Sequence, residues 1–184
     1  MFESNVKIAI YICFIAVLGN VAGLSPRLIP MLTGATVEGS KYMNASVAIH
    51  RHGSTQNFSM QLELNVVSTI DDLRMNMGYF VRVRNMENWI YNKTYNFCDF
   101  LLRPTIDRFG ALVIDELKHR GKVATRCPIQ PERFVFENVT LNRIKLPAFL
   151  PQTSFGLTVN CYIGPKYEPI FRSVWYGRMR RAMV

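Results

Sequence analysis

The 184-residue sequence predicts an all-β protein of antiparallel strands with one amphipathic helix near residues 104–120. Three observations support this prediction. Apolar and polar residues alternate over two long segments, which is the period of a half-buried strand. One segment breaks that period, and two cysteines, Cys98 and Cys127, lie on either side of it. The amino terminus has the pattern of a secretory leader, and cysteines pair in the oxidising compartments to which such leaders direct a chain.

The strongest strand signals lie in residues 58–66 and 75–84. The apolar, inward-facing positions are Phe58, Met60, Leu62, Leu64 and Val66 in the first segment and Met75, Met77, Tyr79, Val81 and Val83 in the second. The residues between them are polar apart from Gly78 and Phe80, and Arg74, Arg82 and Arg84 fall on the outer face. Weaker patterns predict strands at residues 43–49, 89–96, 133–141, 155–163 and 170–176. Neighbouring strands with one polar face are typical of antiparallel sheets.

One segment has helical spacing instead. Its apolar residues recur at intervals of three and four, and they are Ile106, Phe109, Val113 and Leu117, with Leu112 beside them. Pro104 suits a first turn and Gly121 suits the end of a helix. The apolar stripe must cover apolar surface, so we expect the helix to close an edge or an end of the sheets.

The amino-terminal residues and the glycosylation motifs predict secretion. A polar start, an apolar run at residues 8–17 and small residues at 21–23 indicate a signal peptide over residues 1–23, with residues 24–184 as a single domain. An uncleaved signal anchor is the alternative. Four Asn-x-Ser/Thr motifs predict glycans at Asn44, Asn57, Asn92 and Asn138. We therefore expect a secreted, extracellular glycoprotein.

The last of these motifs conflicts with the strand pattern. Asn44, Asn57 and Asn92 have the parity of the outer face, but Asn138 has the parity of apolar Phe134 and Phe136. A β-bulge at residues 137–138 would turn Asn138 outward. Otherwise this glycosylation site is unused, and the sequence leaves both possibilities open.

The cysteines predict one disulfide and one unpaired thiol. Cys13 leaves with the leader, and of the remaining three we expect Cys98 and Cys127 to pair. Closing a loop of about 30 residues stabilises a fold by roughly 3–4 kcal/mol. Cys161 then lies on the inward parity of its strand as a buried thiol, which behaves as a small apolar group. A disulfide to a second chain is the alternative for Cys161.

Three sequence blocks carry a family resemblance. YNKTYNFCDFL, RCPIQPERFVFENVTL and LPAFLP resemble an insect family of small secreted proteins described as a domain of unknown function. That family is similar to the chemosensory CheB-type insect proteins and, more distantly, to ganglioside-activator and other lipid-recognition (ML) proteins. The resemblance covers about residues 58–176. It implies an immunoglobulin-like β-sandwich or β-cup with an apolar cavity for a lipid or another hydrophobic ligand.

The inward parity of the strands and the apolar stripe of the helix indicate which residues would line such a cavity. The predicted ligand-binding residues are Met60, Leu62, Met75, Met77, Tyr79, Phe109, Val113, Leu117, Phe155 and Leu157. Methionine is pliable and suits cavities that accept varied apolar shapes. The alternative is that these side chains simply fill a core.

The sequence thus favours a secreted carrier or presenter of a hydrophobic small molecule or lipid, in chemosensory or pheromone-related signalling, with the helix lining or gating the opening. The alternative is a glycoprotein interaction module with a filled core that binds a receptor or another protein. We do not expect an enzyme, because the sequence has no Gly-x-Ser-x-Gly, His-Glu-x-x-His or phosphate-binding glycine loop. No cofactor is expected. His50 and His52 lack a third metal ligand, so no metal is expected either.

The net charge of +9 indicates an anionic partner or a solvated surface. Nucleic acid is a poor partner for a secreted glycoprotein, and no recognition motif is present. A membrane surface with acidic head groups could be bound by Arg82, Arg84 and the basic cluster at residues 178–181. The alternative is that this cluster is a solvated basic tail.

Overall fold

The computed structural model describes residues 26–52, 57–84, 86–140 and 153–183. Its contacts divide the chain into two compact units, residues 28–181 and a terminal unit of residues 1–27 and 182–184. The terminal unit is described only at the outermost residues of two strands. The predicted signal peptide and Cys13 therefore lie outside the described residues. The buried core of the protein belongs to residues 28–181.

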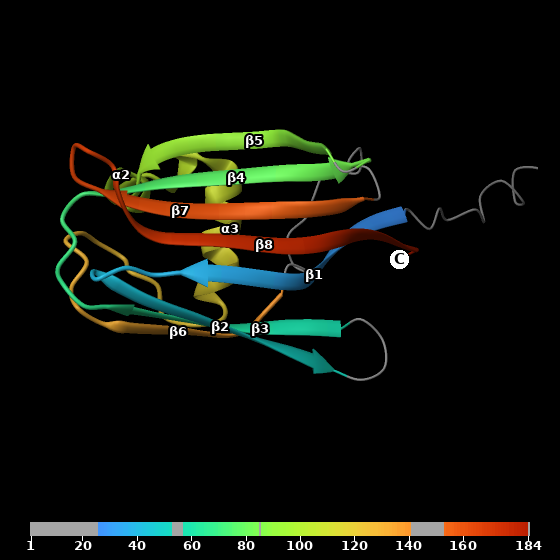
Figure 1. Cartoon of the computed structure of the whole chain (residues 1–184), viewed down its shortest axis with the longest axis horizontal. Helices are drawn as coiled ribbons and strands as arrows, with labels where there is room; N and C mark the ends of the chain where they lie inside the picture. Colours follow the sequence, from blue (N-terminus) through green and yellow to red (C-terminus); the bar gives the residue numbers. More distant parts are fainter. Residues whose placement is uncertain (1–25, 53–56, 85, 141–152, 184) are drawn as a thin grey trace, which may run out of the picture. The chain divides into compact units, whose positions relative to one another are not determined.

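The described strands form two sheets (Figure 1). The five-stranded sheet has the order β1 (Pro26–Glu38), β8 (Glu168–Met183), β7 (Ser154–Ile163), β4 (Leu73–Val83) and β5 (Met86–Asn96). The three-stranded sheet has the order β2 (Met43–His52), β3 (Asn57–Val66) and β6 (Arg133–Val139). The pairs β2–β3, β3–β6, β4–β5, β4–β7 and β7–β8 are antiparallel. The predicted all-β sandwich with a short helical part is confirmed.

Period-two alternation was a reliable guide to the inner face of β3 and β4. Met60, Leu62, Met75 and Met77 are all buried between the sheets. Val83 is the exception, because it lies at the end of β4 beyond the core, where 41% of it is exposed.

Phe80 has the parity of the outer face of β4 and yet is only 3% exposed. Its ring lies over Gly156, where an added Cβ would be 2.1 Å from the Phe80 Cζ atom. The ring of Trp89 covers it from the next strand, with ring centres 5.1 Å apart. The outer face of the larger sheet therefore has a small aromatic cluster that alternation alone did not reveal.

A β-bulge resolves the conflict at Asn138. Met60 lies opposite Val139, and Leu62 lies opposite Phe136, so β6 has one residue more than β3 in this interval. Asn138 adopts a positive φ of 52°, a conformation that asparagine tolerates better than most residues. The bulge leaves Glu137 and Asn138 exposed and returns Val139 to the core.

The helical region differs from the prediction at its start. A 3-10 turn, η1 (Pro104–Ile106), precedes the amphipathic helix α3 (Arg108–Lys118), so the helix begins four residues later than expected. The Asp107 carboxylate caps it by accepting from the backbone N–H groups of Phe109 (3.3 Å) and Gly110 (3.2 Å).

The buried face of α3 matches the predicted stripe in part, because Phe109, Val113 and Leu117 pack against the core. Ile106 and Leu112 are 42% and 43% exposed, whereas Ile114, which was not predicted, is only 7% exposed. Ile106 is exposed in η1, outside the helix to which it was assigned. A second helix, α2 (Phe97–Leu102), was not predicted. Among the described ranges, no helix combines the length and apolar character needed to cross a membrane.

The predicted disulfide is present. Cys98 of α2 and Cys127 are bonded, with Cα atoms 5.7 Å apart, and the bridge joins α2 to the segment that follows α3. Cys161 is a free, buried thiol, as predicted. Its burial keeps the sulfur away from the surface that a second chain could reach, and it raises the pKa of the thiol to about 12.

Candidate functional site: an apolar cavity between the sheets

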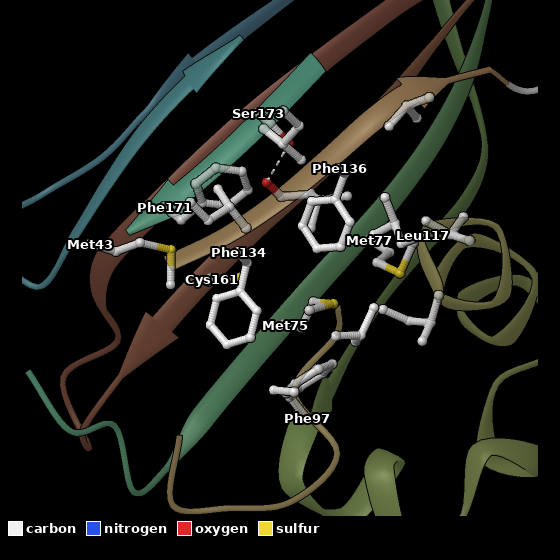
Figure 2. A pocket seen from close by; sticks show the side chains of 18 of the residues that line it. Met43, Met75, Met77, Phe97, Leu117, Phe134, Phe136, Cys161, Phe171 and Ser173 are labelled. Atoms are coloured by element: carbon white, nitrogen blue, oxygen red, sulfur yellow. Dashed lines mark hydrogen bonds between the residues drawn. The ribbon is translucent and has the colours of Figure 1, made fainter. Parts of the chain in front are cut away.

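A cavity of about 150 Å³ lies between the two sheets, and Figure 2 shows the side chains around it. Both sheets, α3 and the segment after α3 contribute to its wall. The lining residues are Leu32, Met43, Leu62, Leu64, Val66, Leu73, Met75, Met77, Phe97, Val113, Ile114, Glu116, Leu117, Val123, Ala124, Ile129, Phe134, Phe136, Val139, Leu157, Val159, Cys161, Phe171, Ser173 and Trp175. The wall is therefore almost entirely apolar.

Strand register places these side chains together. Every second residue of a strand points to the same face, so residues paired across neighbouring strands form rows on the inner face. Met75 of β4 lies opposite Cys161 of β7, which lies opposite Phe171 of β8. Met77 and Val159 form part of the next row. The part of the cavity wall that comes from the larger sheet is thus a direct product of the alternation in β4, β7 and β8.

The two polar side chains in the lining already have hydrogen-bond partners. The Ser173 hydroxyl donates to the Val159 carbonyl oxygen (3.1 Å) and accepts from the Trp175 indole N–H (3.0 Å). Glu116 accepts from the Arg120 guanidinium at 2.9 Å. A ligand would therefore be selected by apolar contact and shape rather than by hydrogen bonds to these groups.

Tyr95 orients the two methionines of β4, and sequence reasoning did not single it out. Its hydroxyl donates to the sulfur of Met77 at 2.8 Å and lies 3.5 Å from the sulfur of Met75. Burial raises the pKa of Tyr95 above its usual value, and nearby Asp107 adds to this. The hydroxyl therefore stays protonated and remains a donor. The signal in the sequence was the inward parity of Tyr95 on β5, opposite Met75.

The cavity is partly open to solvent. Most lining residues are buried, and four of the partly exposed ones, Val113, Leu117, Val123 and Ala124, belong to α3 and the segment after it. Solvent therefore reaches part of the wall on the α3 side, Leu117 included.

The structure brings six of the ten predicted ligand-binding residues to this cavity. They are Leu62, Met75, Met77, Val113, Leu117 and Leu157. Met60 is completely buried beside Val139 and does not line the cavity. The other three form an aromatic cluster, in which Tyr79 lies 6.0 Å from Phe109 and 5.7 Å from Phe155, measured between ring centres. The Tyr79 hydroxyl is buried and has no hydrogen-bond partner among the described residues.

Several lining residues were not predicted. Met43, Phe134, Phe136, Cys161 and Trp175 all contact the cavity. Three of them, Phe134, Phe136 and Cys161, showed the inward parity of their strands in the sequence, so that signal was available. Trp175 could not be found in this way, because no parity was assigned to β8.

Three predicted glycosylation sites and His50 are absent from the cavity lining. Asn44, Asn92 and Asn138 have exposed side chains, and the side chain of Asn57 lies outside the described residues. His50 is exposed on β2. Within the part of the chain that is described, no three side chains of the kinds that bind metals gather into a site.

A family described as "Protein of unknown function (DUF1091)" matches residues 75–157. This range contains both cysteines of the disulfide and lies inside residues 58–176, over which the three sequence blocks carry the family resemblance. No curated protein matches the chain. Among solved structures, chicken MD-1 in complex with lipid IVa aligns with 84% of this chain and 98% of its own, at 10% identity and a TM-score of 0.40.

Proposed function

We propose that this protein is a secreted, non-enzymatic carrier or presenter of a hydrophobic ligand, a lipid or pheromone-like molecule, in insect chemosensory signalling. The observation on which this depends is the partly open cavity whose apolar wall comes from both sheets and whose two polar side chains are already hydrogen-bonded. Binding in such a cavity sequesters apolar surface from water. The recipient of the ligand would be a receptor or a membrane surface.

Secretion is supported by the leader-like residues 1–23, the glycosylation motifs and the disulfide. The Cys98–Cys127 bond forms and persists in oxidising compartments. The exposed side chains of Asn44, Asn92 and Asn138 suit glycan attachment. The chemosensory role is supported by the family resemblance of the three sequence blocks.

The volume of the cavity limits the ligand. An engineered apolar cavity of about 150 Å³ binds benzene, whereas pockets for drug-sized ligands measure roughly 300–1,000 Å³. At about 150 Å³, this cavity takes a small apolar group or one end of a longer chain. A longer ligand would extend through the opening past Leu117, or α3 would move outward to admit it.

The first experiment is native mass spectrometry of the protein secreted from insect cells and purified without detergent, followed by organic extraction. We expect an apolar molecule to be bound in a stoichiometric amount. A fluorescent apolar probe, N-phenyl-1-naphthylamine, then tests the cavity itself. A protein that carries no apolar molecule and also refuses the probe would contradict the proposal and favour an interaction module with a filled core.

Two matched variants locate the binding. Val159→Phe adds a ring to the cavity wall, whereas Val174→Phe makes the same change on the neighbouring strand, where Val174 lies opposite Thr158 on the outer face of the same sheet. We expect Val159→Phe to weaken probe binding at least tenfold and Val174→Phe to leave it unchanged. Equal affinities in the two variants would place the probe elsewhere.

A further inference from the structure

One end of the five-stranded sheet exposes apolar side chains that the core does not use. They lie on the β4–β5 hairpin, where Val83 is 41%, Met86 64%, Trp89 50% and Ile90 52% exposed. Val83 and Met86 are directly paired, and Trp89 is paired with Phe80. Val83 and Met86 share the face of Val81, Trp89 lies on the outer face with Phe80, and Ile90 is the extra residue of a bulge, so the hairpin exposes apolar side chains on both of its faces. We call this group the apolar tip.

The hairpin holds the tip in place. The Arg82 guanidinium binds Glu87 across the two strands at 2.7 Å. The indole of Trp89 rests against the buried ring of Phe80, with ring centres 5.1 Å apart. The exposure of the tip therefore follows from strand pairing and packing rather than from a loose chain end.

A row of basic residues crosses the outer face beside the tip. Arg82 lies opposite Ser154, and Ser154 lies opposite Arg178. A pocket of about 200 Å³ includes all three residues of this row in its wall, together with Phe80 and Tyr176. Arg178 is exposed and forms no ion pair with any described residue. We call Arg82, Ser154 and Arg178 the basic row.

The chemistry of the basic row suits an anionic oxygen group. Arginine binds phosphate and carboxylate oxygens through paired N–H groups, and Arg178 can offer such a pair. The Nη2 group of Arg82 already binds Glu87, which leaves its other N–H groups to face an anion. Arg84, which follows β4 directly, and Arg180 of β8 are also exposed, so further positive charge lies at this end of the sheet.

We propose that this end of the sheet binds the surface of a lipid bilayer that contains anionic lipids. The apolar tip enters the interface, where tryptophan is favoured, and the basic row binds the head-group oxygens. The positive charge of the basic row and the apolar side chains of the tip together favour this partner, because an anionic bilayer offers acidic and apolar groups at adjacent depths. The tip and the row share no residue with the cavity lining, so the proposal stands independently of the cavity ligand.

The test is co-sedimentation of the full secreted protein with vesicles of phosphatidylcholine alone or mixed with phosphatidylglycerol. We expect binding to the mixed vesicles only, and weaker binding as salt is raised. The chain has two tryptophans, and Trp175 is only 7% exposed. A blue shift of the fluorescence on binding therefore reports Trp89.

Three variants test the two parts of the surface. Arg82→Gln with Arg178→Gln removes the basic row, and we expect at least a tenfold loss of binding. Arg103→Gln with Arg172→Gln removes the same charge from exposed arginines elsewhere and should change binding less than threefold. Met86→Ser with Ile90→Ser should abolish the fluorescence shift and weaken binding about tenfold.

Two results would overturn the proposal. The first is a failure of the charge dependence: the two arginine variants bind vesicles equally well, or the unmodified protein does not bind mixed vesicles at all. The second is a combined result: inorganic phosphate fully displaces the protein from vesicles, and the Met86→Ser, Ile90→Ser variant binds vesicles normally. That result would mean that the basic row binds a free anion. Uptake of the apolar probe without vesicles is measured in parallel. It reports the cavity alone, so a failure of one proposal is distinguishable from a failure of the other.

Discussion

Removal of the Cys98–Cys127 disulfide tests how the helical region is held against the sheets. The bond spans a sequence separation of 29 residues and is the covalent link between α2 and the segment that lines the cavity. We consider the double variant Cys98→Ala, Cys127→Ala. Both residues are changed together so that no single thiol remains to pair with Cys161 during folding.

The expected loss follows from the loop length. Cross-linking a loop of 29 residues lowers the entropy of the unfolded chain enough to stabilise the fold by about 3.6 kcal/mol at 25 °C. For a domain of this size each kcal/mol corresponds to roughly 2–4 °C in Tm, so the variant should melt about 7–14 °C lower. Non-covalent contacts still hold the region, because Ile70 and Ile129 exchange two backbone hydrogen bonds of 2.9 Å beside the bridge.

Urea unfolding followed by circular dichroism measures the free energy of unfolding. Reductant provides the control, since it should lower the stability of the unmodified protein to that of the variant and leave the variant unchanged. A loss below about 1 kcal/mol would refute the loop-entropy reasoning. Because the backbone bridge keeps Ile129 in the cavity wall, probe affinity should stay within threefold. A complete loss of probe binding in a folded variant would show that the disulfide itself shapes the cavity.

Further variants test individual side chains. Phe109→Ala should lower the free energy of unfolding in urea by about 2 kcal/mol, because this half-buried ring packs against two tyrosines. Probe affinity should stay unchanged, because Phe109 does not line the cavity. A lower affinity would mean that α3 acts as a gate. Tyr95→Phe should lower the free energy of unfolding by about 1 kcal/mol, and it should alter probe affinity because the Met77 side chain is freed. If stability and affinity both stay unchanged, Tyr95 does not orient Met77. Cys161 should react with a thiol reagent at pH 8 only after unfolding. Its folded pKa of about 12 exceeds the unfolded 9.0, so its contribution to stability is present below pH 9 and lost as the pH rises from 9 towards 12. Between pH 9 and pH 12, the free energy of unfolding of the Cys161→Ala variant should therefore fall less with rising pH than that of the unmodified protein. Asn138→Gln should remove one glycan from the secreted protein, seen as a smaller mass shift on endoglycosidase treatment, and an unchanged shift would mean that this site is unused.

Much of the fold could be predicted because β3 and β4 have long, uninterrupted alternation. Burial of one face of each strand fixes the register, so the inward positions of Leu62, Met75 and Met77 followed from the sequence. Together with Leu157, these are the predicted residues that line the cavity from the two facing sheets. Pattern alone could not separate them from Met60, which has the same parity and packs where the sheets leave no space.

The missed elements are those in which local signals are short or compete. The six residues of α2 are too few to show helical periodicity. Strand β1 includes Pro30 and Gly34, which weaken a strand signal. At α3, Pro104 and Asp107 both resemble a helix start, and the Asp107 cap prevails because its carboxylate also accepts a hydrogen bond from the Tyr91 hydroxyl. The burial of Phe80 depends on Gly156, which is distant in sequence.

The bulge in β6 has a consequence for how this strand can change over time. If Asn138 were deleted, Phe134, Phe136 and Val139 would alternate with Val135 and Glu137 without interruption, and the hydrophobic interior would keep the same occupants. The extra residue is therefore dispensable for packing. Its amide oxygen nevertheless accepts a hydrogen bond of 3.3 Å from the hydroxyl of Ser59, which is only 4% exposed, and the same residue is the asparagine of a glycan acceptor motif. Deletion would remove this hydrogen bond and the motif together.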